Sequence, residues 1–445
     1  MKLPLSTKSS TIWQLVIPIL LGNLAQTAIS LTDTAFLGRL GEIELGAAAM
    51  SGIYYFCFTT LAWGFAIGLQ IIVARRVGEK RFSLIGNTLL HGMMFILPFA
   101  TLLFTLLKFV SPLFMRSALS SEAVYDVSME FLDYRSVGIF FASVNFMFRS
   151  FYIGLSKTKS IGYSTLLMAI TNIVLDWALI FGSPFNEAMG VKGAAIASVC
   201  AEISATLLFI IYTTISKPID GYPIFKGYKF DFSIIKSIFS LSSNTMLQKM
   251  ISYGAWITFF LLIEKMGERS LAVTMVARSA FMLIVMPAFA FGAAANSVSS
   301  QLIGAGKQSE VLPTTFKIIR LCAVVITALV ILLFVNPTIW VGVYTDSEAI
   351  IEQTIPIMYL LCVAAYGYSF AMPLFETVSG TGYTKFALYV EIITLVVYLT
   401  VTWLFAIALQ KSLLMVWTAE ICYSFMLAIG SYIFLRYYKW QNKSV

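Results

Sequence analysis

Long apolar stretches alternate along the chain with short segments rich in Gly, Pro and charged residues. Runs without Asp, Glu, Lys or Arg cover 45–74, 279–306, 321–345 and 353–375. Each run exceeds the roughly 20 residues that a helix needs to span a bilayer. Transmembrane β-strands are much shorter and alternate in polarity, so the pattern excludes a β-barrel. It predicts an all-α integral membrane protein.

The breaks between apolar stretches predict twelve spans. These begin near residues 12, 44, 83, 127, 160, 193, 234, 270, 313, 350, 386 and 413. The connection 216–233 has the length and the Pro and Gly content of a linker. We therefore predict an N-terminal six-helix lobe at 1–215, a cytoplasmic linker at 216–233 and a C-terminal six-helix lobe at 234–445.

The two halves also resemble each other in sequence. Several matches share an offset of 226 positions: Gly41-Glu42 with Gly267-Glu268, Thr158-Lys159 with Thr384-Lys385, and Trp177 with Trp403. Ala201-Glu202-Ile203 matches Ala419-Glu420-Ile421 at an offset of 218. Because six is even, both halves enter the membrane from the same side, which predicts lobes related by a pseudo-twofold axis along the membrane normal. Parallel repeats of this kind occur in secondary transporters, whose substrate sites lie between the repeats.

Composition and charge agree with a membrane protein. Hydrophobic residues make up 59% of the chain and charged residues 12%, whereas soluble domains carry about 25% charge. The net charge of +8 is scattered over short loops instead of forming a patch, so we expect no nucleic-acid partner. Lys and Arg concentrate at both termini and in the even-numbered loops, which places both termini in the cytoplasm.

Motifs for other modes of action are missing from the sequence. It has no G-x-x-x-x-G-K-[ST] loop for ATP and a single histidine, His91, which we expect to be a satisfied polar group. A membrane enzyme would show a cluster of His, Asp or Cys near one membrane face, and a channel would show repeated filter-like segments. We therefore predict a secondary active transporter, not an enzyme, that has no cofactor and is driven by a proton or sodium gradient.

Carboxylates inside predicted spans are candidate functional groups, since each costs about 2.5 to 3.5 kcal/mol on insertion scales. These are Asp33, Asp176 and Glu202 in the first half and Glu376, Glu391 and Glu420 in the second. Three pairs share a helix face through spacings of four or seven residues: Asn172 with Asp176, Ser198 with Glu202, and Gln26 with Asp33. Their faces would converge in one polar pocket of the first lobe.

Such a pocket suits ion coupling. Desolvation favours the neutral form of a carboxyl group, and so does a second carboxylate nearby. The alternative for Asp33 is a structural role, either a pair with Arg39 or an N-terminal polar bond near the helix end. For Glu202 and Glu420, the matching repeat positions favour a shared structural role. Arg135 is expected to snorkel or to pair with Glu130 or Asp133.

Several segments resemble a known transporter family. Pro18-Ile19-Leu20, Gln26 and the stretch 32–41 are similar to the first helix of the multidrug and toxic compound extrusion (MATE) family, in particular its DinF-like branch. The segments 154–159 and 190–198 are similar to the family's patterns before the fifth helix and into the sixth.

The resemblance implies a multi-pass antiporter of the bacterial inner membrane. It would export organic cations and amphipathic drugs by alternating access through a cleft between the lobes, with a proton or sodium ion as the coupling ion. The family's N-lobe coupling pocket corresponds here to Asp33, Asn172, Asp176 and Ser198, where Ser198 replaces a threonine, and Gln26 belongs to the same first-helix motif. Sodium, if it is the coupling ion, would bind Asp33, Asn172 and Asp176.

One departure from the family lies in the second half. The NorM-like branch has a glutamate on its seventh helix, and this chain has Gln248 followed by Lys249 near that position. A C-lobe cation site of that kind is therefore not expected, and Glu202 and Glu376 are only secondary candidates. The alternative function is a lipid-linked precursor flippase of the same superfamily. The expected partners are small amphipathic or cationic molecules and membrane lipid, and the expected state is a monomer.

Overall fold

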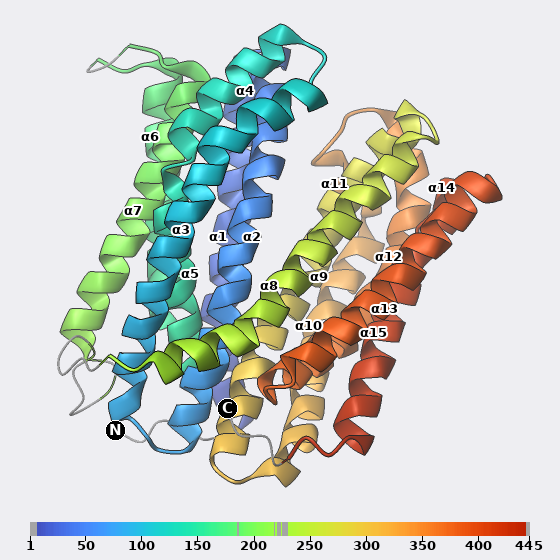
Figure 1. Ribbon diagram of the computed structural model, residues 1–445. Helices are drawn as coiled ribbons and strands as arrows, with labels where there is room; N and C mark the ends of the chain where they lie inside the picture. The colour runs from blue at the N-terminus through green and yellow to red at the C-terminus, as the bar shows by residue number, and fades with distance from the viewer. Residues whose placement is uncertain (1–6, 185–186, 218, 220–223, 225–229, 442–445) are drawn as a thin grey trace. The chain divides into compact units, whose positions relative to one another are not determined.

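The computed structural model describes residues 7–184, 187–217, 219, 224 and 230–441 (Figure 1). The helices of the first half are α1 (Ser9–Leu37), α2 (Glu42–Gly78), α3 (Ser83–Ala118), α4 (Glu122–Arg135), α5 (Gly138–Gly154), α6 (Lys159–Phe181) and α7 (Gly190–Ser216). Those of the second half are α8 (Phe232–Glu264), α9 (Glu268–Gly304), η1 (Gln308–Glu310), α10 (Val311–Val335), α11 (Pro337–Gly342), α12 (Glu348–Gly380), α13 (Thr384–Trp403), η2 (Leu404–Ala408), α14 (Leu413–Val416) and α15 (Thr418–Tyr437).

The predicted helical membrane fold is confirmed. Within the described residues, 11 helices are long and apolar enough to cross a membrane, and the bent pair α4 and α5 brings the number to 12. The fourth span differs from the prediction, which started it near residue 127 as one helix. Instead α4 begins at Glu122, and the chain bends by 52° before α5 begins at Gly138. The physical reason is that α4 is rich in charged residues, so α5 supplies the apolar part of this span.

The chain forms two compact units. Among the described residues, the N-unit contains 17–246, and the C-unit contains 7–16 together with 247–441. The boundaries fall inside α1 and α8, so each of these helices supplies residues to both units. Of the predicted linker 216–233, residues 218, 220–223 and 225–229 lie outside the described part of the chain.

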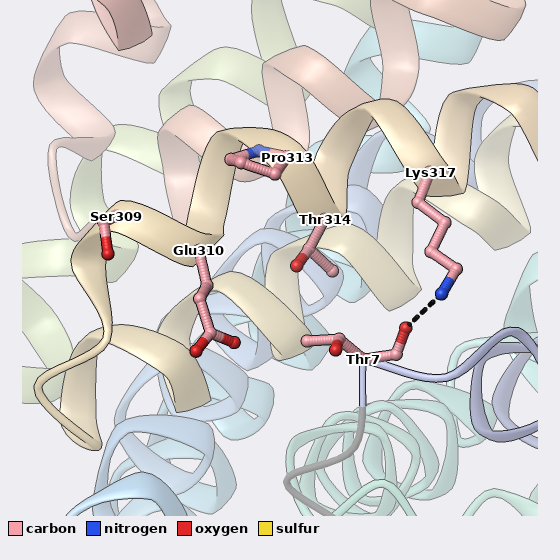
Figure 2. A pocket seen from close by; sticks show the side chains of 6 residues that line it. All are labelled: Thr7, Ser309, Glu310, Pro313, Thr314 and Lys317. Carbon is pink, nitrogen blue, oxygen red and sulfur yellow. Dashed lines mark hydrogen bonds between the residues drawn. The ribbon is translucent and has the colours of Figure 1, made fainter.

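A cavity of about 250 Å³ lies at the start of α10 in the C-unit (Figure 2). It is lined by Thr7, Ser309, Glu310, Pro313, Thr314 and Lys317. The ammonium group of Lys317 donates a hydrogen bond of 2.8 Å to the backbone oxygen of Thr7. This contact ties the segment before α1 to α10. None of the predicted site residues lines the cavity, so the candidate site has to be sought elsewhere.

Candidate ion-coupling site

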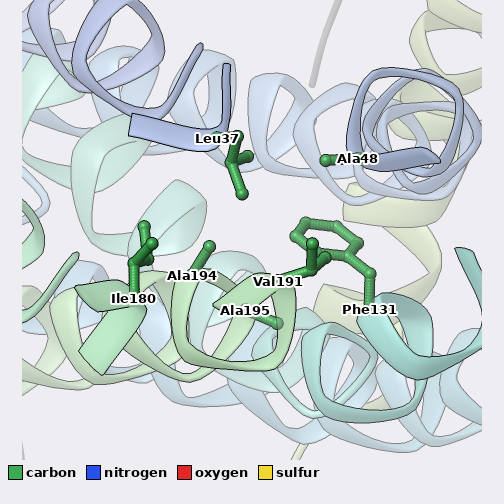
Figure 3. Close-up of a cluster of buried hydrophobic side chains, with 7 residues drawn as sticks. All are labelled: Leu37, Ala48, Phe131, Ile180, Val191, Ala194 and Ala195. Carbon is green, nitrogen blue, oxygen red and sulfur yellow. The ribbon is translucent and has the colours of Figure 1, made fainter. Parts of the chain in front are cut away.

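An apolar cluster joins α1, α6 and α7 in the N-unit, with one side chain each from α2 and α4 (Figure 3). Its buried members are Leu37, Ala48, Phe131, Ile180, Val191, Ala194 and Ala195. Gly193 allows the close approach of α7 to α6, because a Cβ at this position would lie 2.7 Å from the backbone of Leu179. The cluster therefore fixes which faces of the three helices meet.

The candidate residues lie one helical turn from this cluster. Leu37 follows Asp33 by four residues on α1, and Ile180 follows Asp176 by four residues on α6. Residues four apart share a helix face. The two carboxyl groups therefore come from faces that the cluster brings together. Ser198, which is half-buried, lies one turn from the α7 members of the cluster.

The carboxyl groups of Asp33 and Asp176 are close enough to influence each other's protonation, and Asn172, one turn earlier on α6, influences that of Asp176. Asn172 and Asp176 are completely buried, and Asp33 is half-buried. The structure thus brings together the three residues that the sequence placed at the centre of the pocket. The close neighbour of Asp33 is therefore Asp176, whereas the alternative interpretation expected Arg39.

Five polar atoms of this group have no hydrogen-bond partner in the described part of the chain. They are Oδ1 of Asp33, Oδ1 and Nδ2 of Asn172, and both carboxyl oxygens of Asp176. A buried polar group without a partner is expensive and uncommon in folded proteins. Three carboxyl oxygens and one amide oxygen in one buried place form a site that a proton or a small cation would complete.

An arginine lies beside this pocket. Arg135, the last residue of α4, contacts Glu202 of α7 with Nη2 2.6 Å from Oε1 and Nη1 3.0 Å from Oε2. Nη1 also donates to the hydroxyl of Tyr55 at 3.1 Å, and the guanidinium lies 4.1 Å from the centre of the Tyr55 ring. Arg135 acts by charge on Asp33 as well. The positive charge is therefore held by Glu202 within reach of the coupling carboxylates.

Arg135 forms a structural ion pair, as predicted, but its partner is Glu202 and not Glu130 or Asp133. Asp133 instead binds Lys108 at 2.7 Å, and Glu202 binds Arg135. The bend after Arg135 ends α4 at this residue, and its side chain meets α7 in place of the acids on its own helix. The pair is not evident from the sequence, because the two residues are 67 positions apart.

Two further candidates lie outside the buried group. Gln26 is exposed on α1. Glu376 belongs to the C-unit, where the amide of Asn296 donates to its Oε2 at 3.1 Å. His91 is a satisfied polar group, as predicted: its Nε2 accepts from the backbone N–H of Asp231 at 2.8 Å.

The repeat offsets show what replaces the pocket in the C-unit. The offset of 226 relates Asp33, Asn172 and Asp176 to Phe259, Tyr398 and Thr402, and the offset of 218 relates Ser198 to Val416. All four counterparts are buried. The Phe259 ring stacks on Tyr398 at 5.4 Å and packs edge-on against Trp417 at 5.2 Å. Aromatic side chains thus fill the C-unit position that corresponds to the carboxylate pocket.

The repeat-related acids Glu202 and Glu420 share a structural role, as predicted. Glu420 accepts hydrogen bonds from Tyr368 at 2.9 Å and Tyr398 at 3.1 Å, and it lies 3.6 Å from the guanidinium of Arg278. Each of the two acids therefore binds an arginine. Tyrosine hydroxyls lie close to both pairs. Their oxygens are occupied, unlike those of Asp176.

Comparisons with a family model and with known proteins point to one and the same family. The MatE family model matches residues 18–178 and 245–404. A probable multidrug resistance protein NorM of Synechocystis is 23% identical over 78% of this chain and 75% of its own length. DNA damage-inducible protein F of Escherichia coli is 24% identical over 69% of this chain and 66% of its own length. Because relatives of both names match, the DinF-like branch stays a prediction.

Solved structures share the fold at low identity. A MOP superfamily transporter from Pyrococcus furiosus superposes with a TM-score of 0.89 at 20% identity, covering 96% of this chain and 94% of that chain. A structure of MATE in complex with MaL6 gives a TM-score of 0.88 at 22% identity, covering 96% and 95%. The helical arrangement is therefore that of known membrane transporters.

Proposed function

Since the chain belongs to the MatE family of multi-pass membrane transporters, we propose that it is an ion-coupled antiporter that exports organic cations and other amphipathic compounds. Relatives named as multidrug resistance proteins support the efflux direction. The proposed mechanism is alternating access, driven by a gradient of protons or sodium ions.

The observation that supports ion coupling is the set of unpartnered atoms at Asp33, Asn172 and Asp176. Two carboxylates that act on each other in a buried place repel when both are charged. One proton or one sodium ion relieves that repulsion and supplies the missing partner. Ion binding then changes the charge of the pocket by one unit, which gives the ion and a cationic substrate a basis for mutual exclusion.

The pair of Arg135 and Glu202 sets the charge against which the ion binds. Glu202 offsets the positive charge of Arg135 through two contacts. Without that offset, Arg135 would act more strongly on Asp33 and would compete with the coupling ion. We therefore assign ion binding to Asp33 and Asp176, with Asn172 and Ser198 as neutral oxygen donors and Glu202 as the residue that holds Arg135.

The C-unit supports an N-unit location for this pocket. The repeat positions of the three pocket residues on α1 and α6 are occupied by Phe259, Tyr398 and Thr402. The first two rings stack on each other, and all three side chains are buried. Those positions offer no carboxylate, so the repeat does not carry a second copy of this ion pocket.

The same proposal includes the orientation in the membrane. With twelve spans, both termini lie on one side, and the excess of Lys and Arg at the termini and in the even-numbered loops places that side in the cytoplasm. Reporter fusions at the C-terminus and in a predicted external loop test the orientation. A C-terminal fusion that is active only outside the cytoplasm would reverse it.

The test of the function uses purified protein in proteoliposomes. Accumulation of a fluorescent organic cation is measured with an inward or outward gradient of protons alone, and then of sodium alone. We expect one of the two gradients to drive accumulation. No accumulation under either gradient, together with movement of a labelled lipid between leaflets, would replace the antiporter by the flippase.

A further inference from the structure

Glu391 on α13 is a buried acid that the N-unit pocket does not use. Its side chain is 2% exposed. Oε1 lies 2.5 Å from the hydroxyl oxygen of Ser252 on α8, and the hydroxyl of Tyr423 on α15 donates to the same oxygen at 3.1 Å. Oε2 is buried and has no hydrogen-bond partner among the described residues. One oxygen thus has two polar neighbours and the other has none.

The hydroxyl hydrogen of Ser252 can serve either Glu391 or the backbone oxygen of Gln248, but not both at once. The hydroxyl of Ser252 lies 2.9 Å from the backbone oxygen of Gln248 as well as 2.5 Å from Oε1 of Glu391. A serine hydroxyl has one hydrogen to donate, and a backbone carbonyl can only accept. When Ser252 donates to Gln248, the short contact to Glu391 requires a hydrogen on the carboxyl group itself.

The bare Oε2 leads to the same protonation state. An isolated carboxylate oxygen out of water is far more expensive than a neutral carbonyl oxygen. With the hydrogen on Oε1 directed at Ser252, Oε2 becomes the carbonyl oxygen of a neutral acid. The tyrosine hydroxyl of Tyr423 can still donate to Oε1, because a protonated carboxyl oxygen keeps a lone pair.

Charged and titratable groups act on Glu391 from three other helices. Lys249 of α8 and Glu376 of α12 act on it by charge, and Tyr423 of α15 acts on it by hydrogen bonding. The charge of Glu420 also acts on Tyr423. The positive charge of Lys249 and the scarcity of acceptor oxygens disfavour a metal cation, since hard cations are bound by several oxygen ligands.

We propose that Glu391 is a second proton-binding site, in the C-unit, separate from the pocket of Asp33 and Asp176. The proton binds the carboxyl group between Ser252 and Tyr423. When the proton leaves, the carboxylate acts on the positive charge of Lys249, and when the proton returns, the carboxyl group is neutral again. Proton binding therefore changes the net charge of this cluster by one unit.

The contribution of this site to transport rests on the proton-coupled function proposed above, whereas the presence of the proton does not. If Glu391 gives up its proton once per cycle, Glu391→Gln removes one proton from the coupling ratio. Each proton fewer lowers the accumulation that one pH unit can sustain by about tenfold, because one unit corresponds to about 1.36 kcal/mol. Glu391→Gln would then still transport, with a lower maximal accumulation.

Infrared difference spectroscopy tests the proton directly in the purified, membrane-reconstituted protein. We expect the carbonyl band of a protonated carboxylic acid at neutral pH, and we expect Glu391→Gln to lose it. The measurement is made in the double Asp33→Asn, Asp176→Asn background, so that the N-unit pocket contributes no carboxyl band and its function has no influence on the result. Retention of the full band in Glu391→Gln would overturn the proposal.

The matched control is Glu420→Gln, which removes another buried glutamate of the same unit whose two oxygens have partners. This variant should keep the Glu391 band. Tyr423→Phe should shift the band without abolishing it, because it removes one donor to Oε1. An unshifted band in Tyr423→Phe, with Glu391→Gln folded as judged by its melting temperature, would assign the band elsewhere and contradict the site.

Discussion

Arg135 binds Glu202 through two contacts of 2.6 and 3.0 Å, and the pair lies within electrostatic reach of Asp33. Both side chains of the pair are largely buried, at 14% and 13% exposure. A buried pair of this kind gives little net stability, but removing one partner is strongly destabilising because a buried charge is left alone. The pair thus constrains both the fold of the N-unit and the charge beside the coupling pocket.

Glu202→Gln should therefore impair stability and coupling together. Loss of one buried partner costs about 3 to 5 kcal/mol, and the released Arg135 would act on Asp33 in competition with the coupling ion. The melting temperature and the ion dependence of transport are measured in parallel. The double variant Arg135→Gln with Glu202→Gln should recover part of both losses, since no charge remains. Equal losses in the single and double variants would contradict this role of Glu202.

Gly138 provides the space for the Arg135 pair. A Cβ at this position would overlap the guanidinium of Arg135 and would lie 2.5 Å from Oε2 of Glu202. Gly138→Ala should cost about 1 to 3 kcal/mol, the usual range for overpacking, measured by thermal unfolding in detergent. Gly52→Ala on α2 is the control, because nothing lies within 4 Å of its Cβ position. Equal melting temperatures for both variants would show that the pair adjusts freely.

Asp231, which directly precedes α8, should make the stability of the protein depend on pH. Its carboxyl group accepts a hydrogen bond from the backbone N–H of Ser233 at 2.8 Å. Hydrogen bonds from Ser233 lower the pKa of Asp231 below its ordinary value, with a smaller contribution from the charge of Arg76. A lowered pKa means that the charged form stabilises the fold above the ordinary pKa of an aspartate, and that this contribution disappears as the pH falls through the lowered value.

Asp231→Asn should accordingly lower the melting temperature at neutral pH, and the difference from the wild type should vanish in acid. Thermal unfolding at a series of pH values measures this difference. Ser233→Ala removes the side-chain donor and keeps the backbone donor, so it should weaken the pH-dependent difference without abolishing it. A difference between wild type and Asp231→Asn that is constant from neutral to acidic pH would exclude the proposed charge-assisted bond.

The sequence predicted the parts of this protein that depend on local patterns. Apolar runs gave the spans, and the i, i+4 spacing of Asn172 and Asp176 placed both on one face of α6. The apolar cluster one turn away then brought Asp33 to the same place. These features follow from helix periodicity and bilayer thickness, which act on neighbouring residues.

Contacts between distant helices were not predictable in the same way. The partner of Arg135 is 67 positions away, and Ser252 lies 139 positions from Glu391. The choice of partner depends on the bend between α4 and α5 and on helix packing, which a single sequence does not encode by spacing. The one available signal was the presence of Arg135, Glu202 and Glu391 within predicted spans, since such groups need partners.

Gradient-driven transport by Asp33→Asn and Asp176→Asn shows whether this pocket couples the ion to transport. Proteoliposomes with each variant receive the gradient that drives the wild-type protein, and substrate binding is measured separately by intrinsic tryptophan fluorescence. We expect both variants to fold and bind substrate but not to accumulate it. Unchanged gradient-driven accumulation in either folded variant would contradict the assignment of ion coupling to this pocket.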